Sequence, residues 1–123
     1  MKKLLLIAAL LLPGPAMANT LDVITSKLKD GCTFGTYLGI TREFNESWGK
    51  ANGYNAQLML PVHSSDSRMV VWVGNTASAQ AFGKAWDVWR NAMANPNSVE
   101  AKLQARFDAC STQISRASYD TYQ

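Results

Sequence analysis

One short apolar run constrains the fold of this chain more than any other feature of its sequence. Every residue from Met69 to Val73 (MVVWV) is apolar. A run dominated by valine and tryptophan is typical of a strand that is buried on both faces. The segments before and after it are therefore expected to pair with this strand or to pack over it.

The first 18 residues have the pattern of a bacterial secretory signal peptide. Two lysines precede a continuous apolar segment at positions 4–12, and small residues stand at Ala16 and Ala18. The apolar segment is too short to span a membrane, which needs about 20 residues. We therefore expect cleavage after Ala18, export to the periplasm or out of the cell, and no membrane span in the mature chain. Residues 19–123 are expected to form a single domain.

Charge and cysteine content narrow the classes of function. Removing the signal peptide takes away two of the 12 basic residues and none of the nine acidic ones, so the net charge falls from +3 to about +1. The remaining basic residues are scattered, which gives nucleic-acid binding little support. Cys32 and Cys110 are an even pair in an exported domain, which favours one structural disulfide over two buried thiols. With one histidine and no ligand cluster, the sequence predicts no metal site and no cofactor.

The expected elements follow the order strand, helix, strand, strand, helix, short helix, strand. Their ranges are 21–28, 33–51, 54–62, 68–74, 77–94, 99–109 and 111–122. The helices are expected to begin at the caps Thr33, Asn75-Thr76 and Ser98, and the first to stop at Asn52-Gly53. Gly35 and Gly39 in the first helix indicate either close approach of another backbone or a weak first turn.

This order is the βαββαβ plan of the ferredoxin-like fold, in the α+β class. Its four-stranded antiparallel sheet has the order 4-1-3-2, which places the apolar strand near the centre, and right-handed crossovers put the helices on one face. The first and last strands are antiparallel neighbours in this order. The end of the first strand then lies beside the start of the last strand. Cys32 follows the first strand and Cys110 precedes the last one, so the two cysteines are expected to lie close enough for a disulfide.

A sheet covered on one face only leaves an apolar surface exposed. The central strand carries Met69, Val71 and Val73 on one side and Val70 and Trp72 on the other, so either face would be apolar. Apolar patches of this size usually mark an interface. The sequence therefore predicts a homodimer joined through the open sheet face, and it leaves open which of the two faces that is.

The chain resembles the dimeric α+β barrels of the antibiotic-biosynthesis-monooxygenase-like superfamily. The resemblance rests on a helix with Phe44 and Trp48 leading into Asn52-Gly53-Tyr54, then a strand ending in Val71-Trp72-Val73-Gly74, then a capped helix. It implies a fold, and among possible activities a cofactor-free monooxygenase or a haem-degrading enzyme. Haem-degrading members use an Asn, a Trp and a histidine on a helix. His63, the only histidine, falls in a predicted turn, so that triad does not carry over.

Aromatic residues are the remaining signal of a binding site. Four tryptophans in a small domain either fill the core or line a cleft between helices and sheet. The candidate ligand-binding residues are Trp72, Tyr37 and Trp86, with Asn55, Arg68 and His63 as polar groups.

Three classes of function stay open on this evidence: a small-molecule-binding module, a cofactor-free oxygenase, and an interaction protein. A cavity with inward polar groups would favour the first two, and a filled core the third. We favour a domain that binds a small apolar or aromatic ligand or a protein partner.

Overall fold

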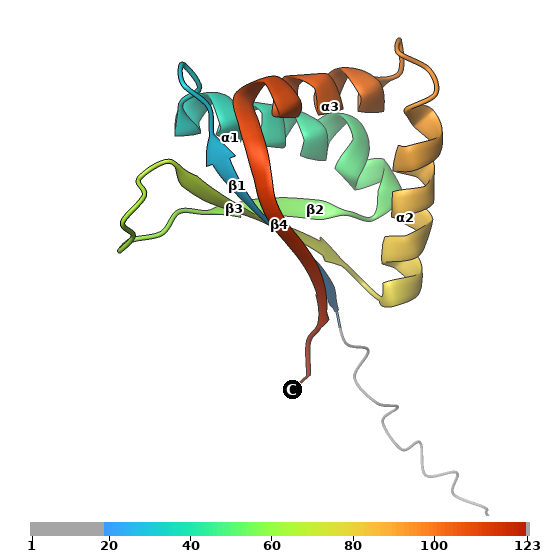
Figure 1. Ribbon diagram of the computed structural model, residues 1–123. Helices are drawn as coiled ribbons and strands as arrows, with labels where there is room; N and C mark the ends of the chain where they lie inside the picture. Colours follow the sequence, from blue (N-terminus) through green and yellow to red (C-terminus); the bar gives the residue numbers. More distant parts are fainter. Residues whose placement is uncertain (1–18, 123) are drawn as a thin grey trace, which may run out of the picture.

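The structure is a computed structural model that describes residues 19–122, and the predicted signal peptide, residues 1–18, lies outside the described residues. The strands are β1 (Thr20–Leu28), β2 (Asn55–Met59), β3 (Met69–Thr76) and β4 (Ser111–Asp120); the helices are α1 (Phe34–Phe44), α2 (Ala79–Ala92) and α3 (Val99–Cys110). They form an antiparallel sheet in the order β2-β3-β1-β4, with the helices over one face (Figure 1). This confirms the predicted ferredoxin-like fold. No helix within residues 19–122 is long and apolar enough to cross a membrane.

Strand β3 determines which face of the sheet is covered. Val70 and Trp72 are buried, whereas Met69, Val71 and Val73 are only partly buried. Because side chains alternate along a strand, the Val70 and Trp72 side faces the helices and the other side is the open face. The sequence left open which face of the sheet is uncovered, and the structure shows that it is the face with Met69, Val71 and Val73.

Helix α2 begins two residues later than predicted. Asn75 and Thr76 are not its cap, because both belong to β3 and pair with Leu21 and Thr20 of β1. The cap is Ser78, whose hydroxyl accepts a hydrogen bond from the Ala81 backbone N–H at 3.1 Å. The predicted caps of the other two helices are confirmed. The side-chain hydroxyls of Thr33 and Ser98 accept hydrogen bonds from the backbone N–H groups of Thr36 and Ala101, respectively.

The sequence predicted one continuous helix over residues 33–51, but the structure divides this segment into three parts. After α1 the chain widens into a π-helical turn, Asn45–Gly49, then tightens into a 3₁₀ turn, Lys50–Asn52. Gly53 ends it in the left-handed region at φ 64°, as predicted. The Asn45 amide bonds both the N–H and the C=O of Ala56 at 2.8 Å, which ties this irregular turn to the edge strand β2. Within the described residues no other backbone closely approaches Gly35 or Gly39, so the first of the two alternatives for these glycines is wrong. A close backbone approach occurs instead at Gly49, beside the carbonyl of Tyr54.

Strands β2 and β4 are both shorter than expected, β2 by more. β2 ends at Met59 rather than at position 62, because Pro61 has no N–H to donate to a ladder. β4 ends at Asp120 rather than at position 122 and is a ten-residue strand that pairs with β1, with one register shift beside Thr25 and Ser26. It forms the exposed edge of the sheet opposite β2.

The two cysteines form the predicted disulfide. Cys32, in the loop after β1, is bonded to Cys110, the last residue of α3, with 5.2 Å between their Cα atoms. The backbone N–H of Lys29 also donates to the carbonyl of Cys110 at 2.9 Å. The disulfide therefore fixes the point at which α3 turns into β4 against the end of β1.

Replacing both cysteines by serine should lower the melting temperature under oxidising conditions. Closing a loop of 78 residues restricts the unfolded chain by about 4.5 kcal/mol in the entropic model, which corresponds to a drop of more than about 10 °C. Thermal unfolding followed by circular dichroism measures it, and wild type and variant should converge in dithiothreitol. Two freely alkylatable thiols in denatured, unreduced wild-type protein would contradict the assignment.

Candidate functional site

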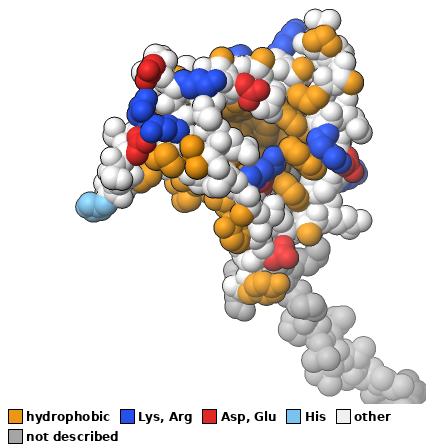
Figure 2. Space-filling view, viewed as in Figure 1, with side chains coloured by type: hydrophobic (Ala, Val, Ile, Leu, Met, Phe, Trp, Pro, Cys, Tyr) orange, Lys and Arg blue, Asp and Glu red, His pale blue; other side chains and the backbone are white. Residues whose placement is uncertain are grey.

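Side chains fill only part of the space between the sheet and the helices. A cavity of about 320 Å³ lies there, within the range of small-molecule sites. Figure 2 shows a hollow floored by apolar side chains in the part of the view that α2, α3 and β4 surround. The residues around it come from all the main layers: Asp22, Ile24, Ser26, Tyr37, Phe44, Trp48, Tyr54, Trp72, Phe82, Trp86, Trp89, Gln104, Phe107, Asp108, Ser111, Gln113 and Arg116.

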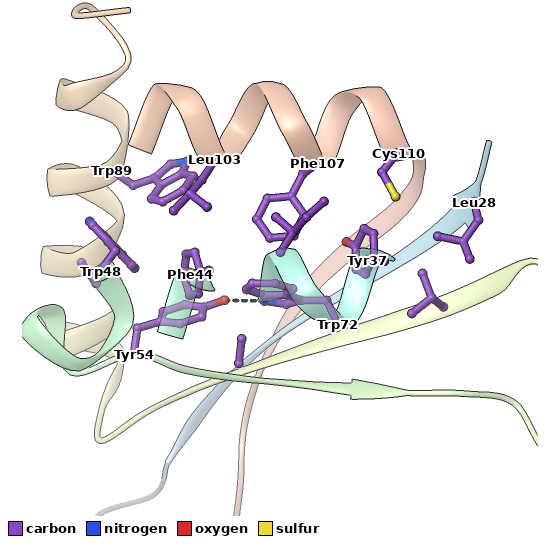
Figure 3. Close-up of a cluster of buried hydrophobic side chains, with 14 residues drawn as sticks. Leu28, Tyr37, Phe44, Trp48, Tyr54, Trp72, Trp89, Leu103, Phe107 and Cys110 are labelled. Carbon is purple, nitrogen blue, oxygen red and sulfur yellow. Dashed lines mark hydrogen bonds between the residues drawn. The ribbon is translucent and has the colours of Figure 1, made fainter. Parts of the chain in front are cut away.

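Aromatic rings form the apolar walls of this cavity. Phe44 of α1 lies at their centre, with ring centroids 4.9 Å from Trp72 and 5.4 Å from Trp89 (Figure 3). Trp72 also meets Phe107 of α3 edge-on at 5.4 Å. Edge-to-face packing of this kind holds large rings in fixed positions. The walls are therefore preformed rather than assembled around a ligand.

A buried polar network forms the opposite wall. Asp22 of β1 is 1% exposed, and the Tyr54 hydroxyl donates to its Oδ2 at 2.8 Å. The Trp72 indole Nε1 donates in turn to the Tyr54 oxygen at 2.8 Å, the dashed contact in Figure 3. Each of these buried polar atoms has a partner, as low-dielectric surroundings require.

Gly74 makes this network possible. It is the cross-strand partner of Asp22 on β3, and a Cβ built on it would lie 1.8 Å from the Tyr54 hydroxyl oxygen. Any other residue at this position would occupy the space of the tyrosine ring. The missing side chain is thus what lets Tyr54 reach across β3 to the carboxylate.

Arg116 of β4 closes the network on the cavity side. Its Nε and Nη2 donate to the two carboxylate oxygens of Asp22 at 2.9 and 2.7 Å. Its guanidinium also lies over the Trp86 ring, 4.1 Å from the centroid, so it joins the sheet to α2. A bidentate pair combined with a cation–π contact holds a long side chain in one orientation.

Two tyrosines of the cavity wall are hard to ionise. Burial raises the pKa of Tyr54 far above its usual value, and the charge of Asp22 raises it further. Burial likewise raises the pKa of Tyr37. Both side chains therefore remain neutral phenols at physiological pH and act as hydrogen-bonding groups rather than as bases.

Three of the six candidate ligand-binding residues line this cavity, namely Trp72, Tyr37 and Trp86. The other three do not. Asn55 is exposed and lines a separate shallow hollow beside the π-helical turn. Arg68 lies outside, just before β3, where it pairs with Asp30.

His63 lies in the exposed loop between β2 and β3, away from both hollows. The neighbouring Asp66 pairs with Lys27 of β1, and this contact lowers the pKa of the Asp66 carboxyl. No group of three or more metal-ligating side chains occurs within residues 19–122.

Sequence reasoning missed the polar half of the site. Asp22, Arg116, Gly74 and Tyr54 were not among the candidates, and the last two were named only in the motifs that carry the family resemblance. The signal that could have found them is the strand register, which pairs Asp22 with Gly74 and with Ser118. An acidic residue facing the helices in a central strand requires a cation or a donor close by.

Comparison with known proteins identifies the fold. The sequence matches no protein-family model and no curated protein. A crystal structure of SnoaB, described as a cofactor-independent oxygenase from Streptomyces nogalater, superposes with a TM-score of 0.58 at 10% identity, over 86% of this chain and 95% of SnoaB. A dimeric ferredoxin-like protein of unknown function from Thermobifida fusca YX gives 0.51 at 7% identity, over 90% and 96%. The fold is ferredoxin-like. At these identities the likeness extends to the fold alone.

Tyr54→Phe should make the stability of the protein less sensitive to high pH. An unfolded tyrosine loses its proton near pH 10, whereas the native Tyr54 keeps it. Above that pH the native state binds more protons than the unfolded state, so the free energy of unfolding falls as pH rises. At neutral pH the free energy of unfolding of the variant should be lower than that of the wild type by about 1–3 kcal/mol, because hydrogen bonds are lost. As the pH rises, this free energy should fall less in the variant than in the wild type.

Urea unfolding at a series of alkaline pH values tests this expectation. Tyr122→Phe is the matched control, because this tyrosine is 88% exposed. If the free energy of unfolding fell equally with pH in wild type and Tyr54→Phe, the burial of a protonated phenol in this network would be contradicted.

Proposed function

We propose that this protein is an exported homodimer that binds a small, flat, apolar or aromatic molecule in the cavity between sheet and helices. The observation that carries the proposal is the cavity itself, about 320 Å³ in volume. Its walls combine many aromatic rings with a few fixed polar groups, the usual composition of a small-molecule site.

The packing supports binding over a purely structural role. A domain that served only as an interaction surface would gain stability by closing this hollow, because closure would remove the apolar faces of its aromatic walls from water. Here Trp72, Trp86 and Trp89 surround open space rather than closing it.

The polar groups favour binding over catalysis. Both oxygens of Asp22 are occupied by Arg116 and Tyr54, and the raised pKa of Tyr54 keeps its proton in place. Neither group is poised to remove a proton from a ligand at neutral pH.

Cofactor-free oxygenation of an aromatic substrate is the second candidate. The fold likeness to SnoaB and the aromatic cavity support it. Oxygen consumption by the purified protein with a phenolic aromatic substrate would favour this candidate over simple binding.

Export rests on the signal-peptide pattern of residues 1–18 and on the disulfide, which is typical of oxidising compartments. Dimerisation rests on the open face of the sheet. Leu21, Val23, Val71 and Val73 are only partly buried there, and Tyr119 is 54% exposed. A second copy packed against this face would remove a contiguous apolar surface from water.

The neutral fluorescent probe N-phenyl-1-naphthylamine should bind the cavity with enhanced emission. Gln113→Trp should weaken binding by about tenfold or more, because Gln113 lines the cavity and an indole there fills it. Gln80→Trp is the matched control, since Gln80 is exposed on α2 and does not line the cavity. Equal binding by both variants, or no binding by wild type, would refute the proposed site.

Sedimentation at micromolar concentration should give twice the mature mass. Val71→Asp places a charge on the open face and should produce monomers, because burying an unpaired carboxylate is costly. Val88→Asp, an equal change at a 39% exposed position of α2, should remain dimeric. A monomeric wild type would show that the open face is not a self-association surface.

A further inference from the structure

Arg116 uses only part of its hydrogen-bonding capacity within the protein. Its Nε and Nη2 bind Asp22 along one edge of the guanidinium group. Within residues 19–122, Nη1 donates to no protein atom. A guanidinium group has five N–H donors in a rigid plane, so the edge formed by Nη1 and the second N–H of Nη2 remains free. Arg116 itself lines the cavity.

The free edge is held in a defined position. Asp22 fixes the guanidinium from the sheet, and the Trp86 ring of α2 covers one of its faces at 4.1 Å. The side chain of Arg116 is 27% exposed, so it is neither mobile in solvent nor sealed in the core. Donors that need no rearrangement bind an acceptor at the least entropic cost.

The charge of Arg116 is already balanced. Its partner Asp22 is 1% exposed and contributes a full carboxylate. The other charged groups nearby are also engaged: Asp108 at the rim accepts from Gln104, Lys29 donates to the Asp108 carbonyl, and Arg90 pairs with Asp87. An anionic ligand would therefore meet no uncompensated positive charge inside the cavity, and would lie close to Asp22.

We propose that Arg116 determines which ligands bind, by presenting its free N–H edge to an uncharged oxygen acceptor, such as a carbonyl, on a flat aromatic ligand. The ligand ring stacks among the tryptophans while its oxygen accepts from Nη1 and Nη2. A carboxylate of the same shape is disfavoured, because it adds an unpaired charge beside Asp22. This inference rests on the proposed binding function and adds the chemical class of the ligand.

Three naphthalenes of similar shape test the proposal by equilibrium dialysis: 2-acetylnaphthalene, 2-ethylnaphthalene and 2-naphthoate. The wild-type dimer should bind the ketone about tenfold more tightly than the ethyl compound, through hydrogen bonds from a charged donor. It should bind the carboxylate at least about tenfold more weakly than the ketone.

The double variant Asp22→Asn with Arg116→Gln removes the charge pair together and should bind ketone and ethyl compound alike. Glu43→Gln with Arg106→Gln is the matched control, because it neutralises an ion pair between α1 and α3 outside the cavity. That control should keep the wild-type preference. Should the first double variant fail to fold, Arg116→Lys keeps the positive charge beside Asp22 but loses the planar edge, and it too should lose the preference.

Each outcome decides between the two proposals. Equal binding of ketone and ethyl compound by wild type, tightest binding of the carboxylate, or a preference that survives the loss of Arg116 would overturn this inference and leave the binding function standing. Absence of binding by all three compounds would overturn the binding function, and this inference with it.

Discussion

The contact between the Tyr54 hydroxyl and the buried carboxylate of Asp22 is the constraint on which the interior of this protein depends. It exists because Gly74 leaves the space that a side chain would fill. A buried carboxylate is tolerated only when its charge and its lone pairs are satisfied. Tyr54 just before β2, Arg116 from β4 and, through Tyr54, Trp72 from β3 meet this requirement. One acidic residue thus connects all four strands on the face that the helices cover.

The cavity follows from the same arrangement. With Tyr54 and Arg116 held at Asp22, the polar wall cannot collapse toward the helices. The rings of Phe44 on α1 and Phe107 on α3 pack edge-on against Trp72 of the sheet, and Phe44 also contacts Trp89 of α2. Hydrophobic burial would favour closing this space. The hydrogen-bonded network opposes closure, because any shift of Arg116 or Tyr54 would leave a buried carboxylate without partners.

Much of the fold could be predicted from local patterns, and much of the site could not. The apolar run at Met69–Val73, the cap at Thr33 and the stop at Gly53 each depend on a few neighbouring residues, so the topology and the disulfide were within reach. Trp72 was predicted because it stands out on that strand. Asp22 was missed, since its importance arises only when strand register sets it opposite Gly74. Arg68 and Asn55 were predicted as polar groups of the cleft, but the alternation of side chains places Asn55 on the open face, and Arg68 pairs with Asp30 outside the cavity.

A double-mutant cycle between Gly74 and Tyr54 tests this account most directly. Gly74→Ala should destabilise the protein by about 1–3 kcal/mol, because its methyl group displaces the Tyr54 ring from Asp22. In a Tyr54→Ala background the same change should have little effect, since no ring remains to be displaced. Urea unfolding of the four proteins should therefore give a coupling free energy above about 1 kcal/mol. Additive effects of the two changes would contradict the view that the space at Gly74 exists to let Tyr54 reach the carboxylate.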